Sequence, residues 1–116
     1  LLERQPRLSV IGQAGDGRAA IDLLRTLPPQ DMPDVMVVDV EMPGIDGIET
    51  TQQVRSAHPG VRVVALSMHD DPNLVAAMQA AGAQAYALKS DPLAAIVQAI
   101  RDVAALRLGH GNPGAG

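Results

Sequence analysis

The chain has 116 residues, of which 47% are hydrophobic and 19% are charged, a composition that indicates one globular domain and excludes a disordered chain. The net charge of −4 argues against non-specific binding of nucleic acid by this chain. Cysteine is absent and no apolar run reaches membrane-spanning length, so we expect a cytoplasmic protein without thiol chemistry or a membrane partner.

Apolar periodicity and turn residues predict four strands that alternate with four helices. In chain order, the expected elements are a strand at 8–14, a helix at 18–27, a strand at 35–39, a helix from about 45 to 57, a strand at 61–66, a helix at 72–81, a strand at 84–88 and a helix at 92–106. An acid followed by proline, at Asp71-Pro72 and again at Asp91-Pro92, predicts that each of the last two helices starts with a capping acid and a proline at its first position. Residues 109–116 are expected to be a linker or a tail.

This alternation predicts an α/β domain with a mostly parallel sheet, covered on both faces by helices that follow right-handed crossovers. Three of the predicted strands end at a polar residue, namely Asp39, Ser67 and Lys89. Because the carboxyl ends of parallel strands meet at one edge of the sheet, where ligands collect, we expect these side chains to converge there. Lys89 is the only lysine in the chain, and its ammonium can pair with Asp39 or with an anion added to it.

Three segments in this order resemble the receiver domain of bacterial response regulators: DVMVVDVEMPGIDGIE, then LSMHDD, then AYALKSDP. The chain is most similar to the branch with a helix-turn-helix DNA-binding output domain, and the likeness is nearly continuous from Leu8 to Leu106. It implies a flavodoxin-like doubly wound fold, with a receiver domain at 1–108. It also implies that Asp39 is the phosphoacceptor, which takes a phosphoryl group from the phosphohistidine of a sensor histidine kinase.

The same resemblance implies roles for the other site residues. Ser67 would bond the phosphoryl oxygens, Lys89 would pair with them, and Tyr86 would be an aromatic switch that swings inward when Ser67 is drawn to the phosphate. A magnesium ion would be held by Asp39 and by the backbone carbonyl of Glu41. The implied activity is phosphorelay signalling toward transcription rather than enzymatic catalysis. A homodimer through residues 72–106 is a further expectation, whereas DNA would be bound only by an output domain outside this chain.

One feature departs from the family pattern. Receiver domains begin with a strand that ends in a pair of magnesium-binding acids, and this sequence does not contain that strand. Asp16 and Asp22 do not replace the pair, because they are predicted to lie in a turn and on a helix. In the receiver strand order 2-1-3-4-5, the strand at 8–14 is then expected to lose its neighbour and expose part of the core. We expect that the sequence lacks its natural N-terminus, or that the partner strand comes from another chain.

Two alternative functions stay open. The segment from Gly15 to Ala20 fits the dinucleotide fingerprint G-x-G-x-x-A, with Asp39 as the acid at the end of the next strand, although this explains neither Ser67 nor Lys89. The second alternative is a receiver-like interaction module that is never phosphorylated, which the missing acid pair allows. No two histidines have ligand spacing, so the sequence argues against a histidine metal site.

Overall fold

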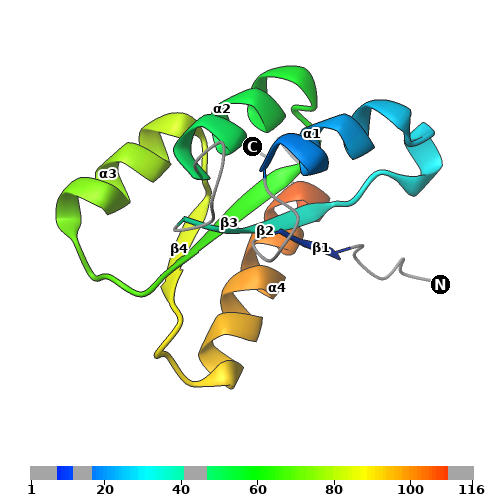
Figure 1. The fold of residues 1–116 in the computed structure, drawn as a ribbon. Coiled ribbons are helices and arrows are strands. Elements are labelled where there is room, and N and C mark those ends of the chain that lie inside the picture. The colour runs from blue at the N-terminus through cyan, green and yellow to red at the C-terminus, as the bar shows by residue number, and fades with distance from the viewer. Residues whose placement is uncertain (1–7, 12–16, 41–46, 110–116) are drawn as a thin grey trace, which may run out of the picture.

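Residues 8–11, 17–40 and 47–109 are described by a computed structural model, in which strands and helices alternate along the chain (Figure 1). In chain order, the elements are β1 (Leu8–Ile11), α1 (Gly17–Thr26), the short 3₁₀ helix η1 (Pro29–Asp31), β2 (Val35–Asp39), α2 (Gly47–Ala57), β3 (Arg62–Ser67), α3 (Pro72–Ala81), β4 (Ala85–Leu88) and α4 (Leu93–Gly109). The predicted order of strands and α-helices is confirmed, and most boundaries differ from the predicted ones by a few residues. The helix predicted at 72–81 has those bounds in the structure.

The four strands form one parallel sheet in the order β1-β2-β3-β4. Figure 1 shows α1, α2 and α3 on one face of the sheet and α4 on the other. Right-handed crossovers explain this arrangement: the chain steps across the sheet in one direction, so each connecting helix lies on the same face. Among the helices of the described residues, α4, which follows the last of these strands, is the one that covers the opposite face (Figure 1). The predicted parallel α/β fold with helices on both faces is therefore confirmed.

The pairing of β1 differs from what the receiver strand order suggests. The expectation that the strand at 8–14 has no neighbour is wrong, because β1 pairs in parallel with β2, starting with Leu8 opposite Val35. An unpaired edge of β2 would leave a row of N–H and C=O groups without partners, and β1 satisfies them. The strand is also shorter than predicted, and residues 12–16 lie outside the described part of the chain.

Alternate residues of the central strands supply two hydrophobic cores, one on each face of the sheet. In β2, Met36 and Val38 face the helices α1 to α3, whereas Val35 and Val37 face α4, and all four are buried. The larger core also contains Ile21, Leu24, Val54, Val61, Val63, Ala65, Met78 and Ala83, and the smaller core also contains Val64, Val103 and Ala104. The apolar run at 35–38 is therefore a strand buried on both faces, as parallel sheets require.

The two Asp-Pro pairs, which look alike in the sequence, behave differently in the structure. Asp71 is the N-cap of α3, and its side chain accepts a hydrogen bond from the Asn73 amide. Asp91 does not cap α4 in this way: its side chain accepts from the amide of Leu88, in the preceding strand. The predicted start of the last helix is therefore confirmed to within one residue, whereas the prediction that Asp91 caps this helix is wrong.

Candidate functional site at the carboxyl edge of the sheet

The carboxylate of Asp39 and the ammonium of Lys89 form an ion pair at the carboxyl edge of the sheet. Lys89 donates from Nζ to Oδ2 of Asp39 at 2.6 Å, although the two residues are 50 positions apart in the sequence. The Asp39 side chain is 19% exposed and that of Lys89 is 35% exposed. The pair is therefore partly shielded from water and partly open to it.

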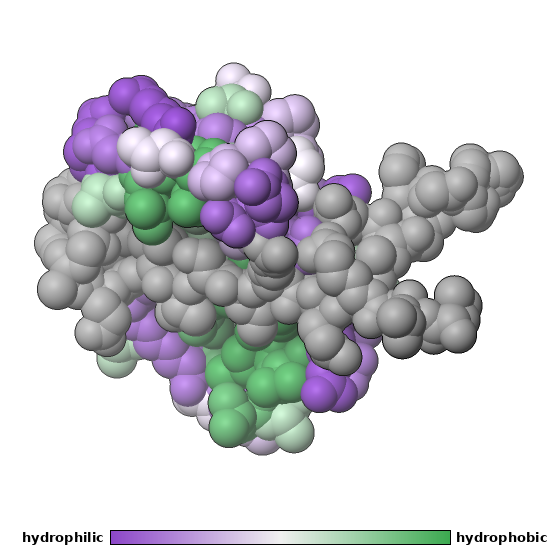
Figure 2. All heavy atoms as spheres, turned by 90° about the vertical axis from the view of Figure 1, so that its right-hand side faces the viewer, coloured by the Kyte–Doolittle hydropathy of each residue, from purple (hydrophilic) through white to green (hydrophobic). Residues whose placement is uncertain are grey.

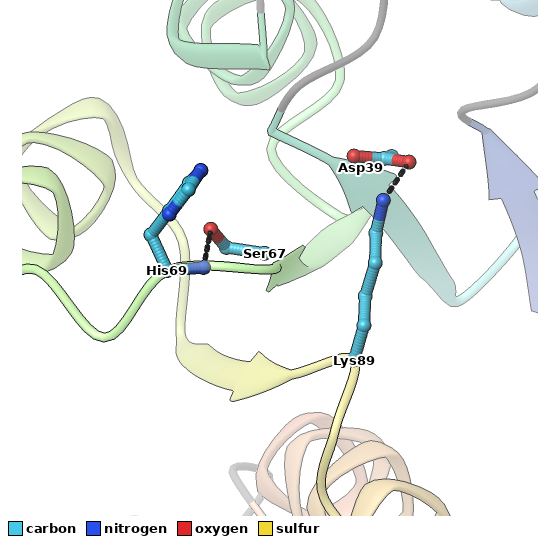
Figure 3. A network of polar contacts seen from close by, with 4 residues as sticks. All are labelled: Asp39, Ser67, His69 and Lys89. Carbon is cyan, nitrogen blue, oxygen red and sulfur yellow. Dashed lines mark hydrogen bonds and ion pairs between the residues drawn. The ribbon is translucent and has the colours of Figure 1, made fainter.

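Backbone hydrogen bonds across the sheet set the positions of these two side chains. Asp39 is the last residue of β2 and lies opposite Leu66, whose carbonyl accepts from the amide of Val40 at 2.9 Å. Lys89 directly follows β4, and its amide donates to the carbonyl of Ser67 at 2.8 Å. Because β3 lies between β2 and β4, the Lys89 side chain reaches across the end of β3 to meet Asp39 (Figure 3).

Ser67 ends the intervening strand and is completely buried. Its Oγ accepts a hydrogen bond from the backbone amide of His69 at 2.9 Å, a contact drawn in Figure 3 beside the Asp39–Lys89 pair. The backbone carbonyl of His69 accepts from the hydroxyl of Tyr86 at 3.0 Å, and the half-buried Tyr86 packs against the larger core. The backbone of one residue, His69, thus connects the Ser67 hydroxyl to the Tyr86 hydroxyl.

The described residues fit a magnesium ion that is held by few protein ligands. Mg²⁺ usually keeps several water molecules and is bound by one or two carboxylates together with phosphate oxygens. Asp39 supplies one carboxylate at this edge, and Glu41 lies outside the described residues. Within the described ranges, no three His, Cys, Asp or Glu side chains are grouped so that they could hold a metal. Among the described residues, Asp39 would therefore hold such an ion, which would supply positive charge beside the carboxylate.

Arg55, whose pKa is shifted, lies at the opposite edge of the sheet, close to the start of β3. Arg55, on α2, donates from Nη1 to the carbonyls of Pro59 and Val61, at 2.7 Å in each case. Burial, and to a lesser extent the positive charge of Arg62, lower the pKa of the Arg55 guanidinium from its ordinary value. These contacts anchor the turn that leads into β3, which is a structural role.

The sequence pointed to two participants at the carboxyl edge but not to the contacts that they make. His69, two residues after Ser67, is expected near the phosphoryl site, but it takes part there through its backbone amide and carbonyl, which carry no signal in the sequence. Asp91 was interpreted as a helix cap because Pro92 follows it, whereas its side chain bonds back to Leu88. Its position two residues after Lys89 was a usable signal, since short-range Asp contacts to the backbone are common in turns.

Comparison with known proteins identifies the family. The response regulator receiver domain model matches residues 1–101. The chain is 33% identical to the transcriptional regulatory protein DegU of Brevibacillus brevis over 104 residues, which cover 90% of this chain and 42% of that protein. It is 40% identical to the response regulator GacA of Pseudomonas viridiflava over 94 residues, covering 81% of this chain and 42% of GacA. The chain thus spans less than half the length of these relatives.

Solved structures agree with this match. The signal receiver domain of NarL from Mycobacterium tuberculosis superimposes with a TM-score of 0.73 at 29% identity, covering 87% of this chain and 98% of that one. A LuxR-family two-component response regulator from Aurantimonas gives a TM-score of 0.78 at 25% identity, covering 88% of this chain and 86% of that one. Among the helices of the described residues, none has the length and apolar character needed to cross a membrane. On the strength of the family match and the shared fold, the chain belongs to the receiver domains of two-component response regulators, which are signalling domains.

Proposed function

We propose that this receiver domain accepts a phosphoryl group on Asp39 from the phosphohistidine of a sensor histidine kinase. The observation that carries the proposal is the 2.6 Å contact between Lys89 Nζ and Asp39 Oδ2 at the carboxyl edge of the sheet. This contact holds a carboxylate nucleophile beside a cation. Phosphoryl transfer relies mainly on positioning and on neutralisation of charge, and both are supplied here.

In the proposed step, a carboxylate oxygen of Asp39 attacks the phosphorus atom of the donor, in line with the P–N bond to the donor imidazole. A P–O bond to Asp39 forms while the P–N bond breaks. The electron pair of the broken bond remains on the imidazole nitrogen, which takes up a proton from water. The product is an acyl phosphate on Asp39, and the Lys89 ammonium pairs with its phosphoryl oxygens.

We propose that Ser67 and Tyr86 respond to the acyl phosphate. Ser67 would donate its hydroxyl to a phosphoryl oxygen. In the structure, Ser67 Oγ accepts from the His69 amide and the His69 carbonyl accepts from the Tyr86 hydroxyl, so a movement of Ser67 would be passed through His69 to Tyr86. The phosphoryl group would then favour the inward state of Tyr86 by a population shift. Tyr86→Phe removes the hydroxyl that bonds to His69. We expect unchanged labelling of Asp39 in this variant but smaller phosphorylation-dependent NMR shifts along residues 72–106, and undiminished shifts would contradict the switch role.

Magnesium is the cofactor that we propose for this step, since Asp39 supplies a carboxylate at the phosphoryl site. When bound, the ion would neutralise charge on the phosphoryl oxygens. Its role is tested by labelling Asp39 with magnesium present and again after chelation with EDTA. Labelling that is equally fast under both conditions would overturn the proposal.

The signal is proposed to leave through α3, β4 and α4, at residues 72–106, toward a second receiver or an output domain. Support comes from exposed alanines on α4, Ala94, Ala95 and Ala105, because small side chains permit close approach by a partner.

The proposed domain end at residue 108 falls just before the end of α4 at Gly109. Transcription is the proposed output because DegU is a transcriptional regulatory protein, and any DNA contact is assigned to an output domain. Sedimentation of the phosphorylated and unphosphorylated protein tests the dimer.

The proposed phosphoacceptor is tested by incubating the protein with a radiolabelled small phosphodonor, such as phosphoramidate, and magnesium. Asp39→Asn keeps the shape of the side chain but removes the nucleophilic carboxylate, so we expect no label. Asp102→Asn is the matched control, since Asp102 is exposed on α4, and it should be labelled like the wild type. Equal labelling of Asp39→Asn would refute the assignment. A folded wild-type protein that takes no label would favour the alternative of an interaction module that is not phosphorylated.

A further inference from the structure

Asp91 closes the turn that carries Lys89. The Asp91 side chain accepts from the amide of Leu88 through Oδ2 at 3.0 Å, and the Asp91 amide donates to the carbonyl of Leu88, also at 3.0 Å. Residues 88–91 therefore form a four-residue turn that is closed twice between its first and last residues. Lys89 and Ser90 occupy the two central positions of this turn.

The same acid-proline pair elsewhere in the chain shows that this geometry is not a helix cap. Asp71 directs its side chain forward to the Asn73 amide, and its carbonyl accepts the first helical hydrogen bond, from Val75. At the start of α4, the corresponding hydrogen bond goes from Ile96 to the carbonyl of Pro92, one residue after Asp91. Asp91 thus lies outside the helix, and its carboxylate accepts a hydrogen bond from Leu88, the last residue of β4.

The backbone of Lys89 is restrained from two sides. On one side, its amide donates to the carbonyl of Ser67, which fixes it to β3. On the other side, the turn closed by Asp91 limits where the chain can go after Leu88. A lysine side chain is long and flexible, so its ammonium remains close to Asp39 only if the backbone that carries it is held in place.

We propose that Asp91 is a positioning residue for Lys89: by accepting from the Leu88 amide, it holds the 88–91 turn that presents the Lys89 ammonium to Asp39. Asp91 acts through its hydrogen bond and not through its charge. The effect on phosphoryl transfer rests on the function proposed above, whereas the effect on the position of Lys89 does not. The two can therefore be measured separately.

The first measurement does not depend on phosphorylation. Because Lys89 is the only lysine, its rate of reductive methylation can be followed by mass spectrometry of the digested protein. Asp91→Ala removes the acceptor, and we expect methylation of Lys89 about fivefold faster, the change that loss of one ordinary hydrogen bond produces in a local equilibrium. Asp91→Asn keeps an acceptor oxygen without the charge and should react like the wild type. Asp71→Ala, which loses the cap of α3, is the control for lower stability and should also react like the wild type.

The second measurement is the rate of Asp39 labelling by phosphoramidate. We expect a fall of about tenfold in Asp91→Ala, because small errors in position weaken phosphoryl transfer strongly. Labelling should be restored in Asp91→Asn and unaffected in Asp71→Ala. If Asp91→Ala methylates Lys89 at the wild-type rate, or if Asp91→Asn behaves like Asp91→Ala, the proposal is overturned. If the wild type takes no label, the proposed function fails, and the methylation rates alone decide the role of Asp91.

Discussion

The Nζ atom of Lys89 lies 2.6 Å from Oδ2 of Asp39, across the end of β3, which lies between the strand that ends at Asp39 and the strand that Lys89 follows. This contact exists only when β2, β3 and β4 are paired in their observed register, because the two residues are 50 positions apart. The folding of the sheet and the assembly of the site are therefore one event. Lys89 is therefore expected to affect phosphoryl transfer directly, whereas buried residues away from this edge are expected to affect it only through the stability of the fold.

Lys89→Met is expected to lower the rate of Asp39 labelling by about a hundredfold, the usual cost of removing one group that stabilises transition-state charge. The methionine side chain has similar length but no ammonium, so the phosphoryl oxygens lose their cation. Arg101→Met removes one positive charge from the exposed surface of α4 and should be labelled at the wild-type rate. The readout is the labelling rate at a fixed phosphodonor concentration. Similar rates for the two variants would show that Lys89 contributes only to net charge.

Gly47→Ala is expected to lower the free energy of unfolding by about 1–3 kcal/mol. A Cβ at this position would lie 2.9 Å from the Val40 Cα and 3.4 Å from the Asp39 carbonyl oxygen, so the backbone at the end of β2 must move. Gly60→Ala is the matched control, because a Cβ there meets nothing within 4 Å. Urea unfolding of both variants measures the difference. Equal stabilities would mean that the first turn of α2 does not press on β2 as the structure shows.

Gln84→Leu is expected to cost about 1–3 kcal/mol of stability, because it leaves a buried amide without its acceptor. Oε1 of Gln84 accepts from the amide of Val63 at 3.2 Å, while the Gln84 amide donates to the Val63 carbonyl. The side chain therefore extends the β3–β4 pairing by one hydrogen bond. Gln84→Glu retains an acceptor oxygen and should be the more stable of the two variants in thermal unfolding. The opposite order would show that side-chain bulk matters more than the hydrogen bond.

Thr51→Val is expected to raise the free energy of unfolding by about 1 kcal/mol. The Thr51 hydroxyl on α2 is buried and has no hydrogen-bond partner in the part of the chain that the structure describes. A methyl group of similar size removes the cost of burying that hydroxyl. Thr26→Val is the contrasting variant. The exposed Thr26 hydroxyl donates to the Leu23 carbonyl at 2.8 Å, so its removal should not raise the free energy of unfolding. A loss of stability in Thr51→Val would mean that its hydroxyl is satisfied in solution.

Local signals made much of the fold predictable. The run at 35–38 is apolar and rich in β-branched valine, a pattern typical of a strand buried on both faces. The helix at 72–81 was predicted with its observed bounds because Asp71 caps it and Gly82 ends it. Gly82 has a φ of 117°, a conformation that favours glycine.

Features that depend on distant parts of the chain were not predictable from the sequence alone. The pairing of β1 with β2 depends on which strand edge is open, and no residue in β1 specifies that. The direction of the Asp91 side chain depends on where β4 ends, although its sequence context matches that of Asp71. At the site, the ends of parallel strands predicted that Asp39 and Lys89 meet, but the link from Ser67 to Tyr86 runs through the backbone of His69.

The central claim is that Asp39 carries the phosphoryl group, and the position of the group can be read directly. After incubation with phosphoramidate and magnesium, borohydride reduction converts a phosphorylated aspartate to homoserine, and mass spectrometry of the peptides locates it. We predict homoserine at position 39 in the wild type, with Asp34, Asp70 and Asp71 unchanged. Homoserine at any other aspartate, with Asp39 intact, would contradict the account.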